Sequence, residues 1–185
     1  VCSSDLVDKS KQMTMDFKTK GATIYMLGEI VDDINCSEYL YSYKGVKLSP
    51  APYFNLEKEA NMQRTLSDLI NQGVIESAHD ISEGGLFIAV LESAMIRNMG
   101  FEIYSAGEVR LDSFLFGESQ GRAIVTVCQG KENEFFDMLN IAGVNCCAVG
   151  NVRDDEEIIV DEEVFGKISK YKQMYDNTIG DVLDK

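Results

Sequence analysis

Apolar positions in the first half of the chain alternate between short continuous runs and helical repeats. Residues 22–28 form a short apolar run closed by a glycine, which predicts a buried strand followed by a turn. Apolar positions recur at helical spacing over 56–72 and Gly73 follows them, so a helix is predicted there. Residues 74–78 predict a second strand, and the largely apolar run 86–99 predicts a buried helix.

The second half continues the same alternation of strands and helices. Residues 122–128 are rich in β-branched side chains, which is typical of a central strand. A helix is predicted over 132–142 and strands over 144–149 and 158–160. The pattern as a whole predicts an α/β fold of the α+β type, with one mixed β-sheet packed with helices. A last amphipathic helix is marked by Val164, Ile168, Tyr171 and Tyr175.

Residues 32–55 show neither the helical repeat nor the apolar runs that predict strands. They carry Gly45, two prolines and a cluster of tyrosines, which favours an ordered loop with little regular structure. Loops of this length often serve a function. We expect residues 1–20 to be a linker or a segment derived from cloning, and 21–185 to form a single domain. A chain that begins at Val1 is expected to be a fragment of a longer one.

Composition narrows the class of protein. The chain has 185 residues, 45% of them hydrophobic and 26% charged, as in one ordinary globular domain. Its net charge of −14 argues against nucleic acid as a partner, because phosphate neutralisation needs a basic surface. No apolar stretch reaches the roughly 18 residues that cross a bilayer, so no membrane partner is expected. The five cysteines form no C-x-x-C pair, which favours reduced thiols in a cytoplasmic protein.

The segment His79-Asp80-Ile81-Ser82-Glu83-Gly84-Gly85 is the first that suggests chemistry. Paired glycines at a helix start let an anion approach backbone amides, so a phosphate is one predicted ligand. Asp80 can contact a magnesium ion beside such a phosphate, and His79 is the one catalytic candidate. The competing interpretation is a plain strand-to-helix connection in which Asp80 or Ser82 caps the helix and His79 is structural.

A second polar cluster lies between two glycines before the 122–128 strand. Its sequence is Gly117-Glu118-Ser119-Gln120-Gly121-Arg122. The side chains of Glu118, Ser119 and Arg122 can form a polar wall at the end of the sheet. A turn closed by an Arg–Glu pair explains the same residues equally well.

Four segments in this order resemble one family: Ile24-Tyr25-Met26-Leu27-Gly28, Ser37-Glu38-Tyr39-Leu40, residues 77–86 and residues 115–122. They are similar to the last domain of the large subunit of phosphoribosylformylglycinamidine synthases, from about Lys11 to the carboxy terminus. Related families are aminoimidazole ribonucleotide synthetase, selenophosphate synthetase, thiamine-monophosphate kinase and a hydrogenase maturation protein. The resemblance implies their α/β carboxy-terminal domain fold, which is paired with a nucleotide-binding amino-terminal domain.

The resemblance also implies a ligase of de novo purine biosynthesis. Such an enzyme uses ATP and magnesium to activate the formamide oxygen of formylglycinamide ribonucleotide, which glutamine-derived ammonia then replaces. The partners implied are the N-terminal domain of the same polypeptide, a glutaminase domain or subunit, and the ribonucleotide substrate. Most ATP and magnesium contacts belong to the N-terminal domain, so the fragment alone is expected to need no cofactor and to be inactive.

Carried over residue by residue, the resemblance places the phosphate of substrate or nucleotide against one group of residues. Two positions depart from the family's pattern: Cys36 stands where glycine is usual, and Gly121 where serine is frequent. The first affects a local turn, and the second removes a hydroxyl contact. The implied phosphate-binding residues are Asp80, Ser82, Gly84, Gly85, Glu118, Ser119 and Arg122.

Three other functions remain open. One is a stand-alone ligand-binding or regulatory α/β module, and a second is a structural role as the degenerate half of a duplicated enzyme. The third is the equivalent domain of another superfamily member. The isolated domain is also expected to form homodimers, because loss of a partner domain exposes apolar surface.

Overall fold

A seven-stranded mixed sheet forms the centre of the protein in a computed structural model that describes residues 9–183. The strand order is β2-β4-β1-β5-β3-β6-β7. All neighbouring pairs are antiparallel except β3 and β6, which are parallel. The fold is therefore the predicted α+β sheet with helices. The strands are β1 (Thr23–Leu27), β2 (Ile75–Asp80), β3 (Gly100–Ile103), β4 (Ala123–Val127), β5 (Cys146–Arg153), β6 (Glu157–Val160) and β7 (Glu163–Lys167).

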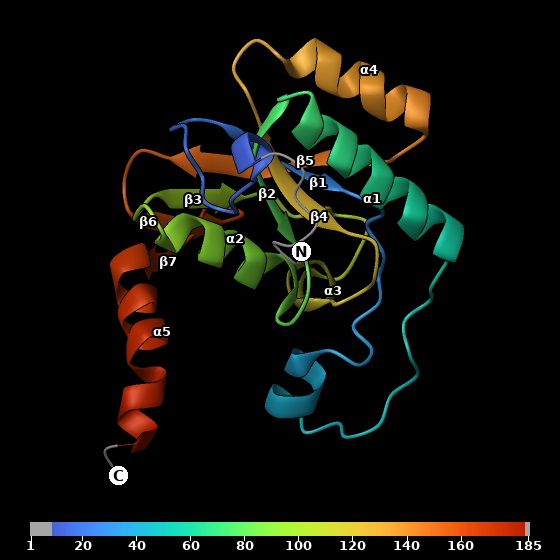
Figure 1. Cartoon of the computed structure of the whole chain (residues 1–185). Coiled ribbons are helices and arrows are strands. Elements are labelled where there is room, and N and C mark those ends of the chain that lie inside the picture. Colours follow the sequence, from blue (N-terminus) through green and yellow to red (C-terminus); the bar gives the residue numbers. More distant parts are fainter. Residues whose placement is uncertain (1–8, 184–185) are drawn as a thin grey trace.

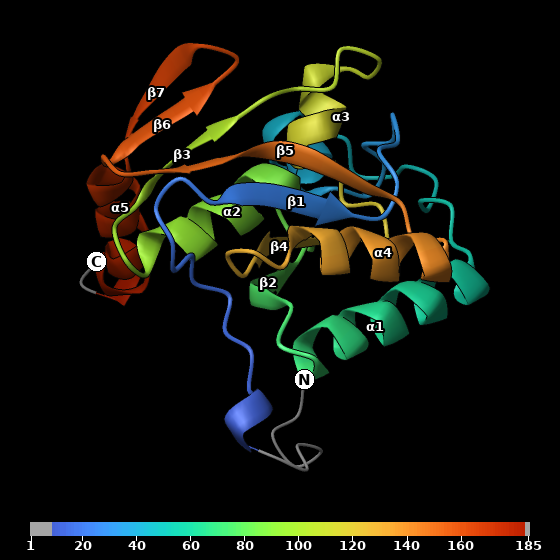
Figure 2. The ribbon, with the colours of Figure 1, turned by 90° about the horizontal axis from the view of Figure 1, so that it is seen from above.

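Helices cover both faces of the sheet (Figure 1 and Figure 2). Along β1, Ile24 and Met26 belong to one apolar cluster and Leu27 to another, as the alternation of a strand requires. The first cluster includes residues of α2 (Gly85–Met95), α3 (Leu111–Phe116) and α5 (Ile168–Leu183). The second includes residues of α1 (Leu56–Asn71) and α4 (Glu132–Ala142). The central strands are therefore apolar on both faces, which explains their continuous apolar runs.

The alternation of predicted elements is confirmed for β1, α1, β2, α2, β4, α4, β5 and β6, with shifted ends. The last helix was predicted wrongly at its start, because Val164 belongs to β7 and α5 begins at Ile168. The buried helix was predicted to reach residue 99 but ends at Met95, and β3 begins at Gly100. The strands β3 and β7 and the helix α3 had no counterpart in the prediction, because glycine and charged residues interrupt the apolar positions of both strands and the six residues of α3 make fewer than two helical turns.

Residues 28–55 leave the sheet after β1, run away from it and return at the start of α1 (Figure 1). One turn of π-helix, Tyr39–Tyr43, is the regular element within this loop. The Tyr39 ring stacks on Phe116 with centroids 5.1 Å apart. This contact holds the loop beside the end of α3.

The segment before β1 contacts the domain. Phe17 is buried in the core, and its amide donates to the Ser93 carbonyl oxygen of α2 at 3.2 Å. Residues 1–8 lie outside the described part of the chain, so the boundary expected at residue 21 stays a prediction.

Two further findings apply to residues 9–183. No helix among them is long and apolar enough to span a membrane. The cysteines of this part are free thiols, at Cys36, Cys128, Cys146 and Cys147. Cys2, which the sequence also grouped with the reduced thiols, lies outside the described residues.

Candidate functional site

Three chain segments meet at one edge of the sheet, where β1 and β2 end and β4 begins. Leu27 and Asp80 both pair with Ala123, from opposite sides of β4. The Ile81 amide continues this pairing by donating to the Arg122 carbonyl oxygen at 3.0 Å. The two polar segments predicted from the sequence are therefore brought together.

Two glycines form the start of α2. Gly84 precedes the helix with a φ of 84°, and Gly85 has a φ of 70°, both in the left-handed region that favours glycine. A Cβ on Gly85 would lie 2.7 Å from the Leu115 carbonyl oxygen and 2.8 Å from that of Gly117. A Cβ on Gly84 would lie 2.4 Å from Ile88 Cγ1. Both glycines are thus required by backbone conformation and close packing.

The helix cap differs from the one predicted. The capping position is Gly84, which has no side chain that could accept a hydrogen bond from the first turn. The interpretation of Asp80 or Ser82 as the capping residue was therefore wrong. The reason is the length of the turn, which places two further residues between Ser82 and the helix.

A carboxylate lies at the start of α2. Oε1 of Glu118 accepts hydrogen bonds from the amides of Gly84 and Glu38, both at 2.8 Å. Hydrogen bonds to a charged carboxylate are stronger than those between neutral groups, and a helix N-terminus favours an anion. The Glu118 carboxylate therefore occupies the position predicted for a bound phosphate. A phosphate that binds the Gly84 amide must compete with this carboxylate.

His79 is held by a neighbouring acid. Its Nε2 lies 2.9 Å from Oε2 of Glu92 on α2, and its Nδ1 lies 3.5 Å from Oδ1 of Asp80. The side chain is 15% exposed. These contacts fix the ring between β2 and α2, and the catalytic role of His79 stays a prediction.

Asp80, Ser82 and Glu83 are the exposed polar residues of the motif. The Asp80 side chain is 77% exposed, so its carboxylate can be approached from solvent. Within residues 9–183, no three His, Cys, Asp or Glu side chains are grouped closely enough to hold a metal ion. The residues described here do not form a complete magnesium site, although Asp80 can supply one of the few carboxylates that magnesium uses.

Arg122 supports the polar loop from inside. Its Nε donates to the Ser119 carbonyl oxygen at 3.0 Å, and its Nη2 to that of Gly117 at 2.6 Å. Burial lowers the pKa of Arg122 to about 10, against the opposing effect of nearby Asp33, Cys147 and Glu118. Only 5% of the residue is exposed, and its predicted phosphate contact stays a prediction.

The structure places Ser119 away from the predicted site and adds Glu38 to it. Ser119 is 94% buried and lines a cavity beside α1 rather than the start of α2. Sequence reasoning assigned no role to Glu38, although it lies in one of the four family-like segments. Glu38 contributes its backbone amide to the site. The type of side chain at a position does not reveal such a role in the sequence.

Comparison with known proteins gives one family and several relatives. The family described as AIR synthase related protein, C-terminal domain, matches residues 19–162. The phosphoribosylformylglycinamidine synthase subunit PurL of Caldanaerobacter subterraneus subsp. tengcongensis is 40% identical over 154 residues. That match covers 83% of this chain and 21% of the relative, so the chain spans about a fifth of the relative's length.

Solved structures show the same fold. The Thermotoga maritima PurL complexed with FGAR superposes with a TM-score of 0.73 at 16% identity, covering 89% of this chain and 30% of that one. The same protein complexed with ATP gives a TM-score of 0.65 at 15% identity, covering 88% and 27%. The family match spans most of the chain, from just before β1 to the turn after β6. This chain therefore belongs to the AIR synthase related protein, C-terminal domain family.

Proposed function

We propose that the chain is the C-terminal domain of an ATP-dependent phosphoribosylformylglycinamidine synthase and lines a ligand cleft in it. The observation that carries this proposal is the 40% identity to a relative of that name. The fold is compatible with the proposal but selects no reaction by itself. The reaction is amidation of formylglycinamide ribonucleotide in de novo purine biosynthesis.

The role of this domain is to position a phosphate-bearing ligand. Phosphoryl transfer needs positioning and charge neutralisation more than covalent chemistry from the protein. A phosphate at the start of α2 would take the Gly84 amide over from Glu118, while Ser82 adds an exposed hydroxyl and Asp80 an exposed carboxylate. Asp80 would be one ligand of magnesium, with the others supplied by phosphate oxygens, water and the N-terminal domain.

The partners belong to the same proposal. They are the N-terminal domain of the same polypeptide, which would hold most of the ATP, and a glutaminase domain or subunit that supplies ammonia. The 185-residue chain would be inactive without them. We place the enzyme in the cytoplasm, in keeping with the free thiols of residues 9–183.

One observation favours the structural alternative. Glu118 already accepts the Gly84 amide, which is the group a phosphate would use first. In a degenerate half of a duplicated enzyme, such a carboxylate would replace the ligand permanently. The exposed residues Asp80 and Ser82 would then be dispensable.

Steady-state kinetics of the whole parent enzyme separate these roles. We expect Asp80→Asn and Ser82→Ala each to lower kcat/KM for formylglycinamide ribonucleotide or for ATP at least about tenfold, equivalent to about 1.4 kcal/mol of transition-state stabilisation. Both side chains are exposed, so the fold should be kept. Asp68→Asn, at an exposed position of α1, is the matched control. Unchanged kcat/KM for both substrates in both variants would make the domain a scaffold.

A further inference from the structure

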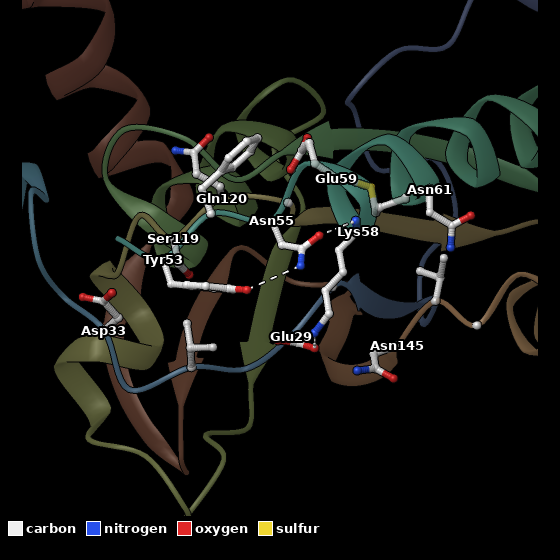
Figure 3. Close-up of a pocket in the computed structure, with 17 residues that line it drawn as sticks. Glu29, Asp33, Tyr53, Asn55, Lys58, Glu59, Asn61, Ser119, Gln120 and Asn145 are labelled. Carbon is white, nitrogen blue, oxygen red and sulfur yellow. Dashed lines mark hydrogen bonds and ion pairs between the residues drawn. The ribbon is translucent and has the colours of Figure 1, made fainter. Parts of the chain in front are cut away.

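A cavity of about 170 Å³ lies beside residues 119–121, and none of its lining residues belongs to α2. It is lined by the start of α1, by segments after β1 and before β4, and by the turn between α4 and β5 (Figure 3). At about 30 Å³ per water molecule, it has room for five or six waters or one small ring. It is smaller than the roughly 300 Å³ at which sites for drug-sized ligands begin.

Two residues that line this cavity each carry a buried polar atom without a hydrogen-bond partner among residues 9–183. These atoms are Oγ of Ser119 and Oε2 of Glu59. The Glu59 carboxylate is held in place through its other oxygen, which accepts from Gln63 Nε2 at 2.6 Å. An unpaired buried carboxylate oxygen is costly, so a ligand that donates an N–H to Oε2 is favoured.

The charges around the cavity select the sign of the ligand. Glu29 is paired with Lys58 at 2.6 Å, so this acid is neutralised. Glu59 and Asp33 also line the cavity, and although Asp33 lies near the buried Arg122, the lining side chains carry an excess of negative charge. Anions, including phosphate, are therefore disfavoured, whereas a neutral or singly positive donor is favoured.

Aromatic and amide side chains define the shape of the ligand. Tyr53 and Phe54 line the cavity and are 76% and 52% exposed, so they lie at its opening to solvent. Their faces can cover a flat group. Asn145 also lines the cavity, and its side-chain amide can both donate and accept.

We propose that this cavity binds a small planar ligand with N–H donors on a delocalised N–C–N unit, such as an amidinium or an amino-substituted heterocycle. Glu59 accepts from the N–H donors, and the Ser119 hydroxyl takes a second polar contact. The site goes beyond the proposed function, because it faces α1 and α4 and uses neither Asp80 nor the start of α2.

Titration of the 185-residue chain with benzamidine tests this site. Benzoate and benzamide are controls of similar shape. Benzoate carries a negative charge, and benzamide has a carbonyl oxygen, an acceptor, in place of one nitrogen. Amide chemical shifts of Ser119, Gly121 and Gly143 report binding at the cavity. We expect saturable shifts with benzamidine at a dissociation constant on the order of millimolar, as suits a ligand of so few atoms, and none with benzoate.

Variants assign the contact to Glu59. We expect Glu59→Gln to weaken benzamidine binding at least about tenfold, the factor that corresponds to about 1.4 kcal/mol. Glu57→Gln, at an exposed position of the same helical turn, should leave it unchanged. Gly121→Ser gives a second route, because a Cβ there lies 2.8 Å from Glu59 Oε2 and should obstruct the ligand. Absence of saturable shifts with benzamidine, equal binding of benzoate, or undiminished binding by Glu59→Gln would overturn the proposal.

Discussion

Asp16 is a carboxylate whose environment sets the response of the fold to acid. Its Oδ2 lies 2.5 Å from Nε of Arg97, and its Oδ1 lies 3.5 Å from Nζ of Lys18. Burial by itself would raise the pKa of Asp16, but hydrogen bonds from Thr14 and Arg97 and the charges of Lys18 and Arg97 outweigh it. The result is a pKa lowered to about 2.

The lowered pKa predicts a loss of stability in acid. The group contributes stability above its unfolded pKa of 3.8, and that contribution disappears as the pH falls toward 2. We expect Asp16→Asn to lower the free energy of unfolding by about 2 kcal/mol at about pH 6 and by about half as much at about pH 3. Urea unfolding of both proteins at the two pH values measures this difference. A difference that does not shrink in the more acidic solution would contradict the ion pairs assigned to Asp16.

Cys36 shows how a single residue can be judged from the sequence. The resemblance identified it as a departure from a usual glycine, and the structure gives it a φ of 56°. The glycine preference thus has a physical cause, since few side chains adopt this left-handed conformation without strain. By contrast, neither the burial of Arg122 nor the orphan oxygen of Glu59 could be predicted, because both depend on packing between segments distant in sequence.

At the scale of elements, the start of α2 is the most constrained feature. Gly85 combines a positive φ with two backbone carbonyl oxygens that would lie within 2.8 Å of an added methyl group. Backbone atoms cannot move aside as a flexible side chain does. The helix start and the end of α3 therefore depend on each other through this one glycine.

This close approach predicts a large effect of one methyl group. We expect Gly85→Ala to lower the free energy of unfolding by about 3 kcal/mol, from strain in φ and from overpacking. Gly107→Ala is the control, because a Cβ there meets no atom within 4 Å and its φ is ordinary. Chemical denaturation gives both values. Equal effects at the two positions would show that α2 does not need the close contact with α3.

Predictability also differs between elements. The long helices α1 and α4 were predicted from their helical periods, and the strands β1 and β4 from continuous apolar or β-branched runs. The strands β3 and β7 were missed because glycine and charged residues interrupt their apolar positions, and α3 was missed because six residues make fewer than two helical turns. The resemblance implied that the two polar motifs lie close together. The hydrogen bond from the Gly84 amide to the Glu118 carboxylate was not predicted, because it depends on the conformation of the Glu118 side chain.

At the scale of the whole molecule, α5 is an element with much unpartnered apolar surface. It extends from the end of the sheet away from the body of the protein (Figure 1). Tyr175, Ile179 and Val182 share one face at helical spacing and are 62%, 73% and 68% exposed. Apolar surface of this kind promotes association.

The exposed face predicts self-association of the 185-residue chain. We expect its weight-average mass in sedimentation to rise with concentration, and Ile179→Asp to return it to that of a monomer. Asn177→Asp adds the same charge on the opposite face of α5 and should leave association unchanged. A monomer at every concentration would show that α5 needs a different partner.

Glu118 has a consequence for communication between distant segments. The same oxygen accepts from Gly84 at the start of α2 and from Glu38 in the 28–55 loop. A ligand oxygen that displaces Glu118 from Gly84 therefore perturbs an anchor of that loop, which the stacking of Tyr39 on Phe116 continues to hold. We therefore predict that binding of such a ligand at α2 and placement of the loop would be thermodynamically linked, each changing the other's equilibrium by the same factor.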